Sequence, residues 1–264
     1  MKRSTLRWPA TVALELWLPV LLLALWWFLS ARSKSVYFPP LSSILTSFAH
    51  DWLNPAGLAK NLLPSLELLG LGFGLAVAGG VIIGVVLGMV PRLEDATRPL
   101  LEILRAIPGV ALLPIFIVLF GIDVQMKVYL IAFGAFWPVL LNTIDGVRGI
   151  EPLLNEVSRV FRFSRVRRLF SIVVPGASPQ IFAGARTALA ISLIILVVSE
   201  TVGANGGIGY FLLNAQRSFA INSMWGAIVA LGILGYVLNI AFRVIERYAL
   251  RWHRLQQARL ESQP

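Results

Sequence analysis

Long apolar segments, separated by short charged ones, dominate the sequence. Hydrophobic residues occupy 57% of the 264 positions and charged residues only 14%, and the mean hydropathy is +0.78. One crossing of a bilayer takes about 20 predominantly apolar residues in a helix, and six runs approach or exceed this length. The sequence therefore predicts an all-α polytopic membrane protein, a single domain over residues 1–264, with six transmembrane helices at about 12–30, 62–90, 100–120, 128–143, 182–199 and 225–244.

The main interruption between apolar runs is the segment 151–181, which carries five arginines. Each guanidinium would cost about 2.5 to 3.5 kcal/mol at a bilayer centre, so this segment is expected at or beyond the membrane surface. Its apolar residues recur at helical spacing, which predicts two short amphipathic helices joined by a bend near Arg162 and Phe163. Ser164 is a suitable N-cap for the second helix, and Pro175 is expected to end it. Contact with anionic lipid and docking of a cytoplasmic partner both fit such a segment.

The same segment resembles the "EAA" loop of binding-protein-dependent ABC importer permeases. The resemblance rests on Glu156, on Pro175, and on Ala177, Pro179 and Ile181 after it. In that family the loop is a cytoplasmic pair of coupling helices that sits in a groove of the ATPase subunit. The family has Glu-Ala-Ala and, six positions after the glutamate, a glycine, whereas this chain has Glu156-Val157-Ser158 and Arg162. Because a Cβ atom disfavours positive φ, the bend is expected to use ordinary dihedral angles or to lie at a neighbouring residue.

Further motifs resemble the nitrate, sulfonate and taurine branch of that family, and most of all its aliphatic sulfonate permeases. They are Leu112-Leu113-Pro114, Phe120-Gly121-Ile122-Asp123, Asn142-Thr143, Gly146-Val147-Arg148, Ser199-Glu200-Thr201, Gly207-Ile208-Gly209-Tyr210 and Asn214-Ala215. The resemblance implies a type I ABC importer permease fold, a homodimer, two ABC ATPase subunits that bind ATP and Mg, and a periplasmic or lipid-anchored substrate-binding protein. The implied solute is a small anion such as an aliphatic sulfonate, with taurine, nitrate or a pyrimidine precursor of thiamine as alternatives.

Two sets of candidate site residues follow. The resemblance implies ATPase coupling by residues of the basic segment, namely Glu156, Ser158, Arg159, Arg162, Ser164, Arg165 and Pro175. Glu156 is expected as a surface contact or a helix-capping acid, and the arginines as partners of acidic groups on the ATPase or of lipid headgroups. A path for an anion favours hydroxyl and amide groups, and its candidates are Asn142, Thr143, Ser192, Ser199 and Glu200. Glu200 is expected to anchor the outer glycine-rich turn by accepting backbone N–H bonds, with proton coupling as the rival role.

Charge placement predicts the topology. Lysine and arginine concentrate before the first span and after the second, fourth and sixth spans, which are the segments on the same side of the membrane as the N-terminus. Because cytoplasmic segments carry the excess of positive charge, both termini are expected in the cytoplasm of a cell with a bacterial plasma (inner) membrane. The inside residues are Lys2, Arg3, Arg7, Arg92, Arg98, Arg148, the five arginines of the basic segment and the C-terminal cluster from Arg243 to Arg259. The outside residues are Arg32, Lys34, Lys60, Lys127 and Arg217.

Spacing of glycine and proline predicts local features of the membrane helices. Small residues recur every four positions at Gly70, Gly74 and Ala78 and again at Gly80, Gly84 and Gly88, which favours close helix packing. Pro108, Pro114 and Pro138 predict kinks in the third and fourth spans. Residues 91–99 are expected as a short cytoplasmic turn and residues 41–52 as an amphipathic segment on the membrane surface.

Several function classes lack their sequence signatures. The chain has no cysteine and only two histidines, far apart, so no disulfide, thiol chemistry or metal site is expected. The nucleotide-binding pattern that ends in Gly-Lys-Ser/Thr is absent, as are common hydrolase motifs, so we expect no enzyme and no cofactor within this chain. The net charge of +10 fits topology rather than nucleic acid. A stand-alone secondary transporter is the distant alternative, although the two halves show no convincing internal repeat.

Overall fold

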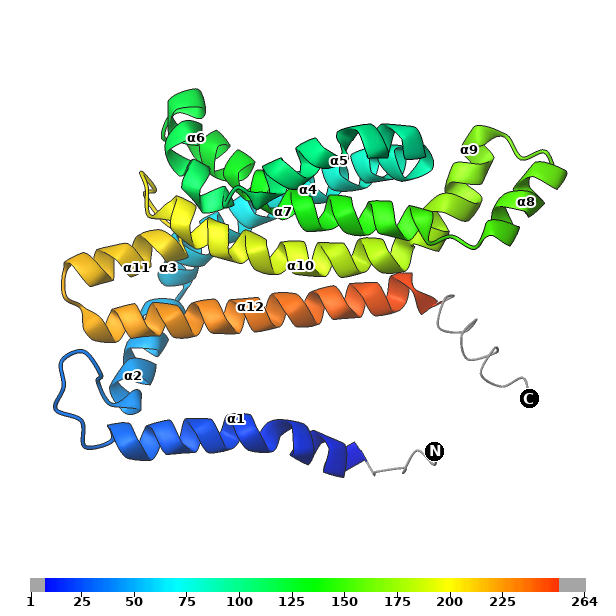
Figure 1. Ribbon diagram of the computed structural model, residues 1–264. Coiled ribbons are helices and arrows are strands. Elements are labelled where there is room, and N and C mark those ends of the chain that lie inside the picture. Colours follow the sequence, from blue (N-terminus) through cyan, green and yellow to red (C-terminus); the bar gives the residue numbers. More distant parts are fainter. Residues whose placement is uncertain (1–7, 252–264) are drawn as a thin grey trace. The chain divides into compact units, whose positions relative to one another are not determined.

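The computed structural model describes residues 8–251, and this part of the chain is helical without any strand (Figure 1). The basic residues expected at the two ends, Lys2, Arg3, Arg7, Arg254 and Arg259, lie outside the described residues. In chain order the elements are α1 (Trp8–Ser30), α2 (Leu41–Trp52), α3 (Pro55–Gly57), η1 (Leu58–Leu62), α4 (Leu63–Met89), α5 (Pro91–Ala106), η2 (Gly109–Leu112), α6 (Leu113–Phe120), α7 (Val124–Arg148), α8 (Pro152–Val160), α9 (Arg165–Arg168), η3 (Leu169–Val173), α10 (Val174–Glu200), α11 (Ile208–Arg217) and α12 (Ile221–Ala249).

The described chain divides into two compact units. The smaller one comprises residues 8–58 and 211–230, and the larger one residues 59–210 and 231–251. Within the smaller unit the predicted amphipathic helix is confirmed as α2, which buries Leu41, Ile44 and Trp52. The Trp225 ring packs 5.9 Å from that of Trp26, and its indole N–H donates to the Tyr37 carbonyl over 3.0 Å. These contacts attach the start of α12 to the end of α1.

Three long helices, α4, α7 and α10, form the core of the larger unit (Figure 1). Their apolar side chains meet in clusters along the bundle, one of them around Leu69, Ile131 and Leu196. The hydroxyls of Thr143 and Ser192 lie inside this bundle and donate to carbonyls one turn back in their own helices. At these positions the bundle is therefore held by dispersion and close backbone approach rather than by polar contacts between helices.

The second of the two predicted glycine stripes is a true packing surface. A Cβ atom on Gly80 or Gly84 would stand 2.8 Å or 2.6 Å from the Cβ atoms of Val139 and Thr143 on α7, so neither position has room for a side chain. Gly70 and Gly74 differ, because a Cβ atom on either would meet nothing within 4 Å. Of the two predicted stripes, only the one from Gly80 onward lies at a close approach of α4 to α7.

By length and composition, four helical stretches of the described chain can cross a membrane: Pro55–Met89, Val124–Arg148, Arg165–Glu200 and Ile221–Ala249. These overlap the expected second, fourth, fifth and sixth spans. The expected first span, 12–30, lies within α1.

The expected third span at 100–120 is not one helix. The segments Pro91–Ala106 and Gly109–Phe120 meet at an 81° bend, so together they can form at most one broken span. Pro108 lacks a backbone donor and disfavours helical dihedrals at Ile107, which has φ −73° and ψ 119°. The expected turn at 91–99 is also wrong, since Pro91 starts α5, where a missing N–H costs nothing.

Candidate functional site: a basic hairpin and a buried carboxylate

Residues 152–173, which we call the basic hairpin, project from the end of the bundle where α7 ends and α10 begins (Figure 1). Its first helix, α8, starts at Pro152 and presents exposed apolar side chains beside its arginines. Val160 and Phe161 are 78% and 70% exposed, and Leu153 is more than half exposed. Apolar groups of this size, gathered on one projecting element, indicate a surface that another molecule covers.

The bend of the hairpin lies at Arg162, which has φ +50°. The Arg162 N–H donates to the Arg159 carbonyl over 3.0 Å, and the Phe163 N–H donates to the Ser158 carbonyl over 2.9 Å. These two bonds and the left-handed residue form a Schellman motif, which normally has glycine at this position. The expectation that Arg162 would avoid positive φ is therefore wrong: the motif satisfies two terminal carbonyls of α8 and holds the arginine in a strained conformation.

The second helix of the hairpin begins as predicted but does not end where predicted. The Ser164 hydroxyl caps α9 by accepting the Arg167 N–H. From there the chain continues through the π-helical turn η3 into α10, so Arg165–Glu200 is one helical stretch and Pro175 lies in the first turn of α10. A π turn widens the hydrogen-bond spacing by one residue, which accommodates a proline that an uninterrupted α-helix would not.

The predicted coupling residues do not all lie on the surface. Arg159, Arg162 and Arg165 are exposed, and so is Glu156, which lies in the middle of α8 rather than in its first turn. Glu156 is therefore not a helix-capping acid. Ser158 is 3% exposed and faces inward, so it cannot contact a partner directly in this conformation.

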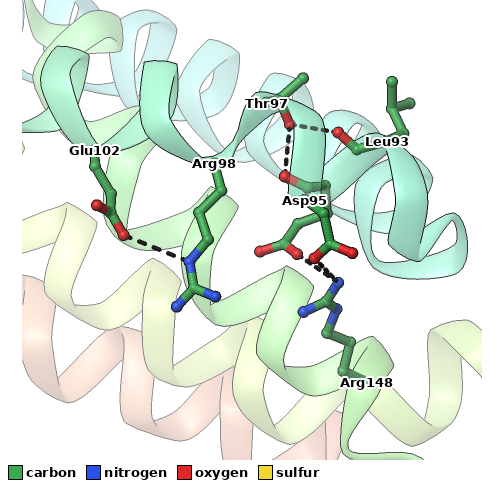
Figure 2. Close-up of polar contacts among 7 residues, drawn as sticks. Leu93, Asp95, Thr97, Arg98, Glu102 and Arg148 are labelled. Carbon is green, nitrogen blue, oxygen red and sulfur yellow. Dashed lines mark hydrogen bonds and ion pairs between the residues drawn. The ribbon is translucent and has the colours of Figure 1, made fainter.

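A cluster of charged side chains that sequence reasoning missed lies along α5 and at the end of α7 (Figure 2). Arg148, the last residue of α7, forms an ion pair with Glu94 of α5 and lies 3.8 Å from the Asp95 carboxylate. One turn further along α5, Arg98 and Glu102 pair at 3.5 Å. Glu94 is nearly buried, so the Arg148 pair ties α5 to the helix that leads directly into the hairpin. An acid separated from its partner by more than fifty residues gives no local sequence signal.

At the opposite end of α10, Glu200 is fully buried and hydrogen-bonded. One carboxylate oxygen accepts the Ser65 hydroxyl over 2.6 Å, and the other accepts the Gly209 N–H over 2.7 Å. Ser65 in turn accepts the Ile208 N–H over 2.8 Å. The prediction that Glu200 anchors the glycine-rich turn is thus confirmed, and Ser65 of α4 is the additional anchor that the sequence did not reveal.

The other residues expected along a translocation path lie inside the helix bundle. Thr143, Ser192 and Ser199 have no exposed surface, and each hydroxyl donates to a carbonyl of its own helix. Asn142 is half-buried and donates to the Pro138 carbonyl over 2.8 Å. In this conformation the three hydroxyl residues pack the bundle. Within residues 8–251 no group of three or more potential ligands could hold a metal ion.

A bundle of apolar helices long enough to span a bilayer, with a charged hairpin at one end, defines a polytopic membrane protein. Residues 77–253 match the family described as "Binding-protein-dependent transport system inner membrane component". The chain belongs to this family. It is thus an inner-membrane permease subunit of a transport system and not an enzyme, and the family that the basic segment resembles is confirmed.

Relatives within the family support the branch that the motifs indicated. A putative aliphatic sulfonates transport permease protein, SsuC, from Bacillus subtilis is 34% identical over 238 residues, covering 89% of this chain and 86% of the relative. The taurine transport permease TauC from Escherichia coli is 27% identical, with 96% and 94% covered. The permease in a structure of the MetNI methionine ABC transporter superposes with a TM-score of 0.65 at 22% identity over 73% of this chain and 95% of that one, which confirms the type I importer fold.

Proposed function

We propose that this chain is the membrane-spanning subunit of an ATP-driven importer for a small oxyanion, with an aliphatic sulfonate as the first candidate. The solutes named for its relatives are aliphatic sulfonates, taurine, bicarbonate and nitrate. All of them carry a compact anionic group of planar or tetrahedral oxygens. A pyrimidine precursor of thiamine is the alternative that departs most from this chemistry.

The basic hairpin is the observation that carries the proposal. Its exposed apolar residues, Val160 and Phe161 among them, lie beside exposed arginines on an element that α7 and α10 join firmly to the bundle. In this proposal the hairpin enters a groove of an ABC ATPase, the apolar groups fill the groove, and Arg159, Arg162 and Arg165 pair with acids at its rim. ATP and Mg are then bound by the ATPase, because this chain has no phosphate-binding loop.

The assembly that follows contains a homodimer of this chain, two ATPase subunits and a substrate-binding protein on the outer side. The positive-inside bias supports a cytoplasmic location for the hairpin and both termini. Contact of the arginines with anionic lipid alone is the competing role. It makes a different prediction, because a hairpin that contacts only lipid has no effect on binding of the ATPase.

Co-purification of the ATPase tests the proposal. The variant Val160→Asp places a charge at the centre of the apolar surface, and Val36→Asp places the same charge at a similarly exposed residue of the smaller unit. We expect Val160→Asp to lose the ATPase and Val36→Asp to retain it. Equal retention by both variants, or no ATPase with the unmodified chain, would refute the coupling role and favour a stand-alone transporter.

ATP hydrolysis by the reconstituted complex tests the solute. With the binding protein present, we expect stimulation by short alkanesulfonates to exceed stimulation by taurine, nitrate and bicarbonate. Stimulation by a thiamine-precursor pyrimidine and by none of the oxyanions would replace the proposed solute class while leaving the importer role intact.

A further inference from the structure

A cavity of about 490 Å³ with several charged lining residues lies in the larger unit, at the end of the bundle where Glu200 anchors the glycine-rich turn. It lies among the start of α4, the start of α7 and the loop 203–206. Its charged lining residues are Lys60, Glu67, Asp123 and Lys127. Such a volume is within the range of small-molecule sites, which usually combine an apolar wall with a few converging polar groups.

Lys127 distinguishes this cavity from an ordinary surface depression. It lies in the first turn of α7 and is only 4% exposed. No ion pair or hydrogen bond of its side chain occurs within the part of the chain that the structure describes. The charges that act on it come from Glu200 and Asp123. Both Glu200 oxygens already accept hydrogen bonds from Ser65 and Gly209, and Asp123 is exposed at the rim.

The Lys127 side chain is thus buried along its length, and its ammonium group faces the cavity without a contacting anion, so an anion that enters the cavity would be its direct partner. We propose that Lys127 is the contact for the oxyanion group of a small solute that enters this cavity, such as the sulfonate of an alkanesulfonate. This inference deepens the proposed function and rests on it. The rim holds one lysine, Lys60, and two carboxylates, Glu67 and Asp123, so a singly charged anion is favoured over a multiply charged one.

Uptake by the complete complex is the first test. We compare Lys127→Met, which keeps the length of the side chain, with Lys127→Arg, which keeps its charge, and with Lys34→Met at an exposed lysine of the smaller unit. For ethanesulfonate, Lys127→Met is expected to raise the apparent KM about tenfold or more with little change in basal ATP hydrolysis. Lys127→Arg should recover most of the loss and Lys34→Met should match the unmodified chain. An unchanged KM in a folded Lys127→Met complex would overturn the inference.

Cysteine labelling is a second test that does not depend on transport. The chain has no cysteine, so a single one can be placed at Asn205 in the cavity or at exposed Val36 as a control. Each is labelled with an anionic sulfonatoethyl and with a cationic trimethylammonioethyl methanethiosulfonate. Relative to the control, Asn205→Cys should favour the anionic reagent several-fold, and Lys127→Met should abolish this preference.

Protection by ethanesulfonate covers the case in which Lys127→Met does not fold. With Lys127 in place, ethanesulfonate should slow labelling of Asn205→Cys by the anionic reagent, and propanol at the same concentration should not. No anionic preference and no protection would overturn the cavity site even if the complex imports a sulfonate. If Asn205→Cys shows the anionic preference and the protection but no oxyanion stimulates ATP hydrolysis by the complex, the cavity site is retained and the proposed transport function is refuted.

Discussion

Replacing Arg162 by glycine should stabilise the turn of the basic hairpin. Arg162 has φ +50° as the left-handed residue of a Schellman motif, a conformation that costs an L-residue roughly 1–2 kcal/mol. Glycine avoids that cost but loses about 0.5–1 kcal/mol more chain entropy on folding. The difference predicts a net local stabilisation of about 0.5–1 kcal/mol for Arg162→Gly. Arg162→Ala keeps the strain and should show no such gain.

Hydrogen exchange of the Phe163 amide measures this effect directly, because that N–H closes the motif by donating to the Ser158 carbonyl. A stabilisation of 0.5–1 kcal/mol corresponds to roughly two- to fivefold slower exchange. Arg159→Gly is the matched control, since it places a glycine inside α8 and should accelerate exchange by a similar factor. Exchange that is unchanged or faster in Arg162→Gly would refute the assignment of strain to Arg162.

The same variant separates the stability of the turn from coupling. If the Arg162 guanidinium pairs with an acid on the ATPase, Arg162→Gly will combine a more stable turn with weaker stimulation of ATP hydrolysis. Arg162→Lys retains the charge and the left-handed strain, so it should preserve stimulation without the gain in protection. Full stimulation in Arg162→Gly would show that this arginine contributes nothing to the contact.

Three further substitutions test the bundle and its charged contacts. Gly80→Ala should destabilise the chain by roughly 1–3 kcal/mol in thermal unfolding because its Cβ would lie 2.8 Å from Val139, whereas Gly74→Ala, with open space around it, should be neutral or slightly stabilising. Glu200→Ala should cost roughly 1–3 kcal/mol because a buried backbone donor loses its acceptor, and a loss below 0.5 kcal/mol would argue against the anchor. A double-mutant cycle of Arg148→Ala and Glu94→Gln should give a coupling energy of about 1 kcal/mol, and additivity would show that this ion pair does not hold α5.

The long helices could be predicted because each depends on a local property, the length of an apolar run. That property does not reveal what interrupts a run. The sequence 100–120 is apolar enough for a span, yet the chain bends by 81° between Ala106 and Gly109 because Pro108 constrains the residue before it. Pro138 occurs in equally apolar surroundings and lies inside the continuous helix α7. A proline leaves one carbonyl of the preceding helical turn without its backbone donor. Whether the helix breaks there depends on neighbouring groups that satisfy this carbonyl, and the sequence does not show these neighbours.

The hairpin illustrates the same division between local and tertiary information. Its helices, its bend and the Ser164 cap follow from residue spacing and are present in the structure. The conformation of Arg162 does not follow, because propensity alone argues against positive φ for arginine. The two backbone bonds of the Schellman motif offset that preference. At Glu200 the acceptor role was predictable from a carboxylate beside glycines, whereas the contributions of Ser65 and Lys127 require the tertiary fold.

The continuous helix from Arg165 to Glu200 gives the molecule a mechanical link that separate helices would not provide. Its α10 part has 27 residues, so it is about 40 Å long at 1.5 Å per residue. One end is fixed within the hairpin by the η3 turn, and the other end carries the carboxylate that holds Gly209 and Ser65. A helix of this kind resists bending, so we expect a displacement of the hairpin by a partner to be transmitted to the glycine-rich turn and to the cavity that contains Lys127. The proposed sites for ATPase coupling and for the oxyanion are therefore the two ends of a single element, and a change at one is expected to alter the other.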